Sequence, residues 1–440
     1  MIKEYLLSNI LFKKRLKLLT EKIKLYDNLT LEEDIVKYQI RIFNKTWKNA
    51  YTNIPFYIEW KKKHDLPEQV ESINDLINFP ILTKKDIHNN QELIFKNLED
   101  FCIVTTGGTS GITTNFPTTN IELDEVYANG YLGRSWWGIR PFDNILMFWG
   151  HSHLFGKGFR KYIALFKREF SDFLINTTRV SSYSLRYENI EVFYQNIIKI
   201  LPQVIISYSS NLYKICKHLE SNNIKHVKNN LKGIILTSET VTDIDISMIE
   251  KIFCSSVIQE YGMAETGQIA YSYIETNNIR VFWDSFIVTT NENEELHLTT
   301  LSNKIFPLIN YSSEDNVHVK TRYNNSVLSL SKINGKIRNI LNIPFRDGDV
   351  QQISTIFFDH VLKNYSNIYS LHYRQLSKGI RIYIVSDIDL NLESLKTYFD
   401  SEILKEFPKM NSECIVLEQM NQEPKTVAGK SKVMLDNDIC

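Results

Sequence analysis

Between residues 100 and 300, short apolar runs alternate with stretches of helical periodicity. The runs at 145–149, 204–206 and 233–236 are almost wholly apolar, whereas the stretches at 189–200 and 209–220 carry apolar residues every three or four positions. Such runs are typical of strands that are buried on both faces. Strands that alternate with helices predict a layered α/β architecture.

The flanking regions follow other patterns. Residues 1 to about 50 predict helices, which the segment Asn53–Tyr57 interrupts, and residues 277–330 predict β-hairpins. After Gly335 the pattern predicts a smaller α+β unit, with helices at 353–364 and 392–407 and strands at 380–385 and 415–417. We therefore expect two domains, a large layered α/β domain over 1–334 and a small α+β domain over 335–440.

Composition narrows the class of protein. The chain has 440 residues, of which 43% are apolar, and its formal net charge is zero. A neutral chain gives no reason to expect a nucleic-acid partner. No apolar run approaches the roughly 18 residues that a membrane span needs, and the basic amphipathic N-terminal helix is expected to pack on its own domain rather than on a membrane.

Cellular location is predicted from the cysteines and the N-terminus. Five cysteines, at 102, 216, 254, 414 and 440, form no C-x-x-C pair, which suits a reducing compartment. The apolar residues Tyr5–Leu7 precede the basic residues Lys13–Arg15, which is the reverse of a signal peptide. We expect a cytoplasmic protein; its oligomeric state is left open.

Three short segments contain residues that are suited to nucleotide binding, metal binding or catalysis. Thr105–Gly111 reads Thr-Thr-Gly-Gly-Thr-Ser-Gly, so its backbone N–H groups and hydroxyls could surround a polyphosphate. Tyr261–Gly267 sets Glu265 in a glycine-flanked turn, where a carboxylate could bind Mg²⁺. Lys430 follows Gly429 near the C-terminus. Each segment alone is commonly a solvated turn, but a fourth, Pro307–Asp315, falls in the same order along the chain.

In this order the four segments resemble those of the adenylate-forming superfamily, which contains acyl-CoA synthetases, luciferases and the adenylation domains of peptide synthetases. The chain is most similar to the phenylacetate–CoA ligase group and its capsular-polysaccharide branch. Asn53–Tyr57, Phe79–Asp86 and Ile206–Leu212 also resemble segments of that group. The resemblance thus extends over nearly the whole chain, and it implies the adenylate-forming fold, with ATP and Mg²⁺ as cofactors.

The resemblance also implies a role for each matched position. The implied phosphate loop consists of Thr106, Gly107, Gly108, Thr109, Ser110 and Gly111; the implied base-side residues are Ser238, Glu239, Thr240, Tyr261 and Gly262. Asp315 would accept hydrogen bonds from the ribose, and Glu265 would serve the Mg²⁺–phosphate cluster. Lys336 would lie at the hinge before the small domain, and Lys430 would bridge the carboxylate and the α-phosphate during catalysis.

Some positions depart from the family pattern. Ile112 and Thr113 replace a usual Lys-Pro after the phosphate loop, and Asn310 and Ser312 stand where arginines are usual. At the hinge, Lys336 replaces an arginine, and residues 338 and 339 replace acidic ones. The hinge changes bear on the second, domain-rotated half-reaction.

The expected reaction joins two anions, a carboxylate and the α-phosphate of ATP, so it needs a nearby cation such as Lys430. The acyl group would then pass to a thiol, CoA, or to an amine such as an amino sugar in surface-polysaccharide assembly. Candidate pocket residues are Trp136, Trp137, Trp149, His151 and Phe155; for the three tryptophans a role in the buried core is at least as compatible. A metal pair at His151 and His153 is disfavoured because further ligands at fixed spacing are missing.

Two alternative functions belong to other classes of protein. A nucleotide-sugar glycosyltransferase could bind a metal through the Asp pair 243/245 or 387/389, although Asp is also common as a helix cap. The second rival is a non-catalytic scaffold that keeps the fold as a binding module. The joint presence of Glu265, Asp315 and Lys430 argues against the scaffold.

Overall fold

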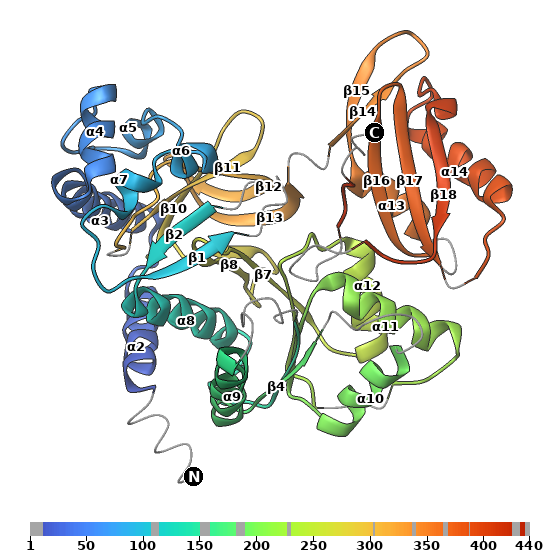
Figure 1. Cartoon of the computed structure of the whole chain (residues 1–440), viewed down its shortest axis with the longest axis horizontal. Helices are drawn as coiled ribbons and strands as arrows, with labels where there is room; N and C mark the ends of the chain where they lie inside the picture. Colours follow the sequence, from blue (N-terminus) through green and yellow to red (C-terminus); the bar gives the residue numbers. More distant parts are fainter. Residues whose placement is uncertain are drawn as a thin grey trace. The chain divides into compact units, whose positions relative to one another are not determined.

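The computed structural model describes residues 12–106, 114–149, 159–181, 190–226, 230–301, 304–336, 340–363, 368–386, 388–424 and 432–435. Figure 1 labels its helices and strands. Contacts between residues divide the chain into two compact units. Unit 1 contains residues 1–143 and 258–334, and unit 2 contains residues 144–257 and 335–440. Each unit is therefore assembled from two separate stretches of the chain. The predicted division into 1–334 and 335–440 stays a prediction.

Unit 1 begins with helices. Their bounds are α2 Lys13–Asn28, α3 Glu32–Asn53, α4 Pro55–His64, α5 Ile73–Ile77, α6 Lys84–Asn89 and α7 Gln91–Phe95. The predicted interruption at Asn53–Tyr57 falls between α3 and α4, where Pro55 occupies the first turn of α4. Proline fits there because the N–H that it lacks has no helical partner at that position. α5 and α6 both begin with a capping box, Ser72 with Asp75 and Thr83 with Asp86.

The strands of unit 1 form a hairpin and an antiparallel sheet. The hairpin pairs β1 (Cys102–Thr106) with β2 (Thr114–Thr118), and α8 (Asn120–Ser135) follows it and packs on β8. The order in the sheet is β10-β11-β12-β13-β9-β8-β7. The bounds are β7 Val257–Met263, β8 Gly267–Ser272, β9 Ile279–Val281, β10 Phe286–Thr290, β11 Glu295–Thr300, β12 Tyr311–Tyr323 and β13 Ser326–Lys336. The hairpins predicted within 277–330 are thereby confirmed.

Unit 2 contains a parallel sheet with intervening helices. The strands β3 (Ile145–Trp149), β4 (Thr177–Ser181), β5 (Val204–Ser207) and β6 (Gly233–Thr237) run in the order β6-β5-β3-β4. The helices are α9 Phe159–Leu174, α10 Ile190–Ile200, α11 Ser209–Ser221 and α12 Asp243–Phe253. Every residue of β5 and β6 is buried, because α10, α11 and α12 contribute apolar side chains to one core with these strands. The layered α/β architecture expected from the apolar runs is confirmed.

The C-terminal part of unit 2 has its own apolar core. Its elements are β14 Ile340–Pro344, β15 Val350–Ser354, α13 Thr355–Lys363, β16 Ile368–Leu376, β17 Gly379–Ser386, α14 Leu392–Glu406 and β18 Ile415–Met420. β17 pairs antiparallel with β16 and parallel with β18, and α13 and α14 pack against this sheet. The predicted helix at 353–364 was correct except for its start, since residues 350–354 form the second strand of the hairpin β14–β15. Among the described residues no helix is long and apolar enough to span a bilayer.

Candidate active site

Two carboxylates of the predicted motifs lie near each other in unit 1, each held by a tyrosine. The hydroxyl of Tyr261, on β7, donates a 2.8 Å hydrogen bond to Oδ2 of Asp315, on β12. Both side chains are buried, and burial together with the charge of Asp315 raises the pKa of Tyr261 well above its usual value. The phenol therefore stays protonated and donates its proton. Asp315 therefore accepts this hydrogen bond from a neutral phenol, and its contact with a ribose stays a prediction.

Glu265 is held in a similar way. The hydroxyl of Tyr311 donates a 2.7 Å hydrogen bond to Oε1 of Glu265, and burial raises the pKa of Tyr311. The ammonium group of Lys84 lies 3.6 Å from the same oxygen, and the Glu265 side chain is only 2% exposed. For Oε2 of Glu265, the part of the chain that the structure describes provides no hydrogen-bond partner. One oxygen of this carboxylate is thus anchored by Tyr311 and Lys84.

Lys84 belongs to the segment Phe79–Asp86, but the resemblance implied no role for it. The structure shows how the lysine reaches Glu265. The backbone N–H of Leu82 donates to the carbonyl oxygen of Asn310 at 3.0 Å, and the N–H of Ser312 donates to the carbonyl oxygen of Leu82 at 3.0 Å. The segment therefore lies parallel to the start of β12, and the capping box of Thr83 starts α6 so that Lys84 stands at its first position. The order of motifs could not predict this contact.

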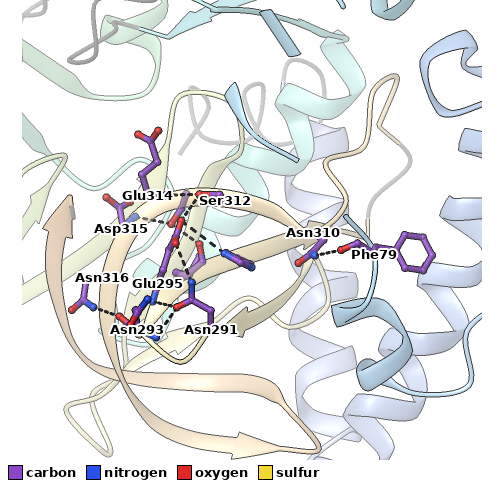
Figure 2. Close-up of polar contacts among 12 residues, drawn as sticks. Phe79, Asn291, Asn293, Glu295, Asn310, Ser312, Glu314, Asp315 and Asn316 are labelled. Atoms are coloured by element: carbon purple, nitrogen blue, oxygen red, sulfur yellow. Dashed lines mark hydrogen bonds and ion pairs between the residues drawn. The ribbon is translucent and has the colours of Figure 1, made fainter. Parts of the chain in front are cut away.

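The two positions that lack the family's arginines make structural hydrogen bonds. The side-chain amide of Asn310 donates a 2.6 Å hydrogen bond to the carbonyl oxygen of Phe79 (Figure 2). Ser312 donates to the carboxylate of Glu295, and its own hydroxyl oxygen accepts from the backbone N–H of Glu314 at 3.3 Å. These short side chains hold the start of β12 in place through hydrogen bonds, and neither carries a positive charge.

A small cavity lies beside Glu265. It measures about 60 Å³ and is lined by the hairpin residues Val104, Phe116 and Thr118, by Glu122 of α8, by Glu265 and by Lys304. Glu122 accepts hydrogen bonds from the backbone N–H of Ile305 at 2.8 Å and from the hydroxyl groups of Thr118 and Thr119. Burial raises the pKa of Glu122 and lowers the pKa of Lys304. Neither residue carried a sequence signal, because neither belongs to a recognisable motif.

Other predicted site residues are placed in unit 2. Glu239 accepts hydrogen bonds from the backbone N–H of Ser210 at 3.0 Å and from its hydroxyl at 3.1 Å, at the N-terminus of α11. Ser238, next to it, has a positive φ of 68°. Trp149 ends β3, and its ring packs at 4.8 Å on the ring of Tyr208. Contact of Ser238–Thr240 with a nucleotide stays a prediction, as does a role for Trp149 in an acyl pocket.

The predicted hinge also lies in unit 2. Gly335 has a φ of +80°, and a Cβ placed there would collide with Oγ1 of Thr240. A glycine is thus required by both the backbone conformation and the close approach. Lys336 follows it at the end of β13. The hinge role of Lys336 stays a prediction.

Several predicted residues lie outside the described part of the chain. They are Gly107, Gly108, Thr109, Ser110 and Gly111 of the phosphate loop, His151 and Phe155 of the proposed pocket, and Lys430. Thr106 is the last residue of β1 and pairs with Thr114. Trp136 and Trp137 are half-buried. Trp136 packs against Tyr26 and Phe282, and Trp137 donates to the carbonyl oxygen of Ser272. The choice between pocket and core stays open for both.

The described residues fit a magnesium ion that is held partly by the phosphates of a substrate. No group of three His, Cys, Asp or Glu side chains in the described ranges could enclose a metal. Mg²⁺ in nucleotide sites is commonly held by one or two carboxylates together with substrate phosphates. Glu265, whose Oε1 is anchored and whose Oε2 has no hydrogen-bond partner among the described residues, matches that arrangement.

One curated relative matches part of the chain. It is the Staphylococcus aureus protein named CapK, to which this chain is 23% identical over 233 residues, which cover 53% of this chain and 51% of CapK. The chain thus matches about half the length of that relative. No protein-family model matches the chain.

Solved structures show the fold. The crystal structure of 2-hydroxyisobutyryl-CoA ligase with an acyl-AMP superposes with a TM-score of 0.71 at 14% identity, and the match covers 92% of this chain and 90% of that one. The anthranilate CoA ligase AuaEII in complex with anthranoyl-AMP gives a TM-score of 0.52 at 12% identity, over 76% of this chain and 66% of that one. The chain has the fold of adenylate-forming CoA ligases. This confirms the fold class that the motifs implied.

Proposed function

We propose that the protein is an adenylate-forming carboxylate ligase. It uses ATP to convert a carboxylic acid into an acyl-AMP with release of pyrophosphate, and then passes the acyl group to an acceptor. The observation that carries the proposal is the meeting of three motif segments around Glu265. Lys84, Glu265 and Tyr311 come from 79–86, 261–267 and 307–315, and they converge in one unit next to the Tyr261–Asp315 pair.

The proposed adenylation gives each of the site residues a role. Asp315 accepts hydrogen bonds from the ribose, and Tyr261 fixes the orientation of that carboxylate. Glu265 presents Oε2 toward the phosphates, where a bound Mg²⁺ would neutralise negative charge. The role proposed for Lys430 is to bridge the substrate carboxylate and the α-phosphate and so relieve their repulsion. Closure of the C-terminal part keeps water from the acyl-AMP.

The proposal has two forms, which differ in the acceptor of the acyl group. Transfer to CoA agrees with the solved structures, whose names are those of CoA ligases. Transfer to an amine, such as an amino sugar in cell-surface polysaccharide assembly, agrees with the sequence resemblance to the capsular branch and with the partial match to CapK. We propose CoA or an amine as the acceptor, with the surface-polysaccharide pathway as the setting.

The test measures pyrophosphate release from ATP with a panel of carboxylic acids. Each acid is assayed with CoA, with amino sugars and with neither acceptor. The expected result is release that depends on the carboxylate and continues beyond one turnover only with the true acceptor. A thermal-shift titration with ATP runs in parallel. A protein that ATP does not stabilise, and that releases no pyrophosphate with any acid, contradicts the proposal.

A further inference from the structure

Helix α3 carries a positively charged stripe on its solvent side. Arg41, Lys45 and Lys48 are spaced by four and three residues, so they lie on one face of the helix, and all three are exposed. The opposite face of α3 is buried and includes Phe43 and Trp47. The stripe is therefore a surface that the packing of α3 within unit 1 leaves open to solvent.

Helix α4 extends the positive charge. It ends with Lys61, Lys62 and Lys63, of which Lys61 is half-buried and the other two are exposed. The ammonium group of Lys61 lies 5.2 Å from the ring centre of Tyr51, which stands one turn after Lys48 on α3. The two groups of cations thus adjoin each other, and Figure 1 shows α3 next to α4. We call these six residues the basic face: Arg41, Lys45, Lys48, Lys61, Lys62 and Lys63.

The charges of the basic face are not neutralised by neighbouring carboxylates. Among the residues that the structure describes, no carboxylate lies within 4.0 Å of any of these six cations. Lys37, one turn before Arg41, differs, because a carboxylate oxygen of Glu33 lies 2.6 Å from its ammonium group. Residues 37–64 hold seven Lys and Arg against one acidic residue, Glu59, a formal charge of +6 in a chain whose net charge is zero. Because like charges repel, a negatively charged partner would stabilise this surface.

The composition of the basic face favours one class of partner. Five of its six residues are lysines, which are depleted at protein–protein interfaces relative to the rest of the surface. Single-stranded nucleic acids stack their bases on open aromatic rings, but the rings beside these cations are engaged, since Tyr51 packs on Trp47 and Trp60 stacks on Phe56. Anionic lipid headgroups require neither feature, because clusters of about four to eight Lys or Arg attract them through charge alone.

We infer that the basic face docks on the anionic headgroups of a lipid membrane. The contact is peripheral, because the cations lie against lipid phosphates while the apolar face of α3 stays in the core of unit 1. Each Lys or Arg close to such a surface raises the affinity roughly fivefold, and salt screens the attraction. The inference does not depend on the proposed reaction, although a ligase of surface-polysaccharide assembly would gain from a position at the membrane.

The test is co-sedimentation of the full chain with lipid vesicles. One set of vesicles contains phosphatidylglycerol and phosphatidylcholine in equal parts, and the other contains phosphatidylcholine alone. The protein is expected to bind the first set at low salt, to be released progressively as salt is added, and not to bind the second set. Equal binding to both sets, or binding that salt does not weaken, overturns the inference.

A triple variant, Lys45→Gln with Lys48→Gln and Lys62→Gln, removes half of the charges of the basic face. It is expected to weaken binding to the anionic vesicles about a hundredfold, since each charge contributes roughly fivefold. The variant should fold, because all three side chains are exposed and glutamine has nearly the helix propensity of lysine. Thermal unfolding checks this. Unchanged vesicle binding in the folded variant overturns the inference.

The matched control removes three exposed lysines from unit 2, Lys251→Gln, Lys378→Gln and Lys405→Gln, and so changes the net charge equally. It is expected to bind the anionic vesicles as tightly as the wild type. An equal loss in both triple variants would show that only total charge matters, and it overturns the inference. If the variant of the basic face does not fold, the wild type decides through its dependence on lipid charge and salt.

A parallel titration with single-stranded RNA distinguishes the other polyanion. Binding to RNA that the variant of the basic face loses, without binding of the wild type to anionic vesicles, assigns the surface to nucleic acid and overturns the inference. Carboxylate activation without vesicles should be the same in both triple variants, because neither changes a residue of the candidate site. A failure of the proposed function is therefore distinguishable from a failure of membrane docking.

Discussion

The ammonium group of Lys84 lies 3.6 Å from the carboxylate of Glu265, although the two residues are 181 positions apart (265 − 84). Their contact depends on main-chain hydrogen bonds that fix Leu82 against Asn310 and Ser312. A buried carboxylate beside a lysine and a tyrosine keeps a defined orientation before any ligand arrives. Such preorganisation lowers the reorganisation that binding requires.

Tyr311→Phe is expected to destabilise the protein by about 1–3 kcal/mol, because the buried Glu265 loses a hydrogen-bond donor. Urea unfolding followed by circular dichroism measures this. Tyr323→Phe, at the other end of β12, is the control and should leave the midpoint unchanged. Equal midpoints for the wild type and Tyr311→Phe would show that this hydrogen bond contributes nothing.

Asp315→Asn is expected to weaken ATP binding about tenfold or more, because a charged acceptor for the ribose hydroxyls is lost. Tyr261→Phe should weaken it less, since the carboxylate remains and loses only its orienting donor. Fluorescence titration with an ATP analogue measures both affinities. An Asp315→Asn variant that binds ATP as tightly as the wild type contradicts the ribose assignment.

Lys430→Ala is expected to abolish carboxylate-dependent pyrophosphate release while ATP binding persists. Removal of one group that stabilises charge in the transition state typically costs about 3 kcal/mol, or two to three decades in rate. Lys432→Ala, two residues along, is the matched control and should stay active. Turnover at the wild-type rate in Lys430→Ala rules out the catalytic role.

Glu122→Gln is expected to change the dependence of stability on pH. The pKa of Glu122 is raised by burial above its usual 4.5, so the folded protein holds this proton more tightly than the unfolded chain. The contribution of Glu122 to stability is therefore full below pH 4.5 and is lost as the pH rises through the folded-state pKa. Thermal midpoints should coincide below pH 4.5, and the variant should become relatively more stable toward pH 7. A difference that does not vary with pH contradicts this.

Gly335→Ala is expected to destabilise unit 2 by about 2–4 kcal/mol, because a positive φ and a collision with Thr240 act together. Gly348→Ala separates the two causes, since Gly348 has a φ of +90° but open space around its Cβ. It should cost only about 1 kcal/mol. Adding Thr240→Ala to Gly335→Ala should recover part of the loss, and no recovery would show that the collision is unimportant. Thermal unfolding of the three variants measures these effects.

Much of the fold could be predicted from periodicity. The strands at 145–149, 204–206 and 233–236 were predicted almost to the residue, because runs that are this short, almost wholly apolar and separated by helical stretches are typical of strands in a covered parallel sheet. The start of the helix at 353 was wrong by two residues. Ile353 is apolar and fits a helix by spacing, but its strand pairs with Leu341, and pairing between strands is not visible in local periodicity.

The site was predictable only where a motif carried it. Tyr261, Glu265 and Asp315 stand in segments that resemble a known pattern, and the structure brings them together within unit 1. The contact of Lys84 with Glu265 joins distant parts of the chain, for which a single sequence gives no signal. The packing of Trp136 on Tyr26 and Phe282 is a contact of the same kind.

The bonds between Leu82 and the start of β12 are made by peptide groups, which every amino acid except proline can supply through its N–H. Substitutions along either segment can therefore accumulate without moving the lysine that follows. The residue types along these two segments can therefore change while the main-chain hydrogen bonds, and with them the backbone arrangement, are kept. A chain with only 14% identity to a solved ligase can on this account retain its architecture.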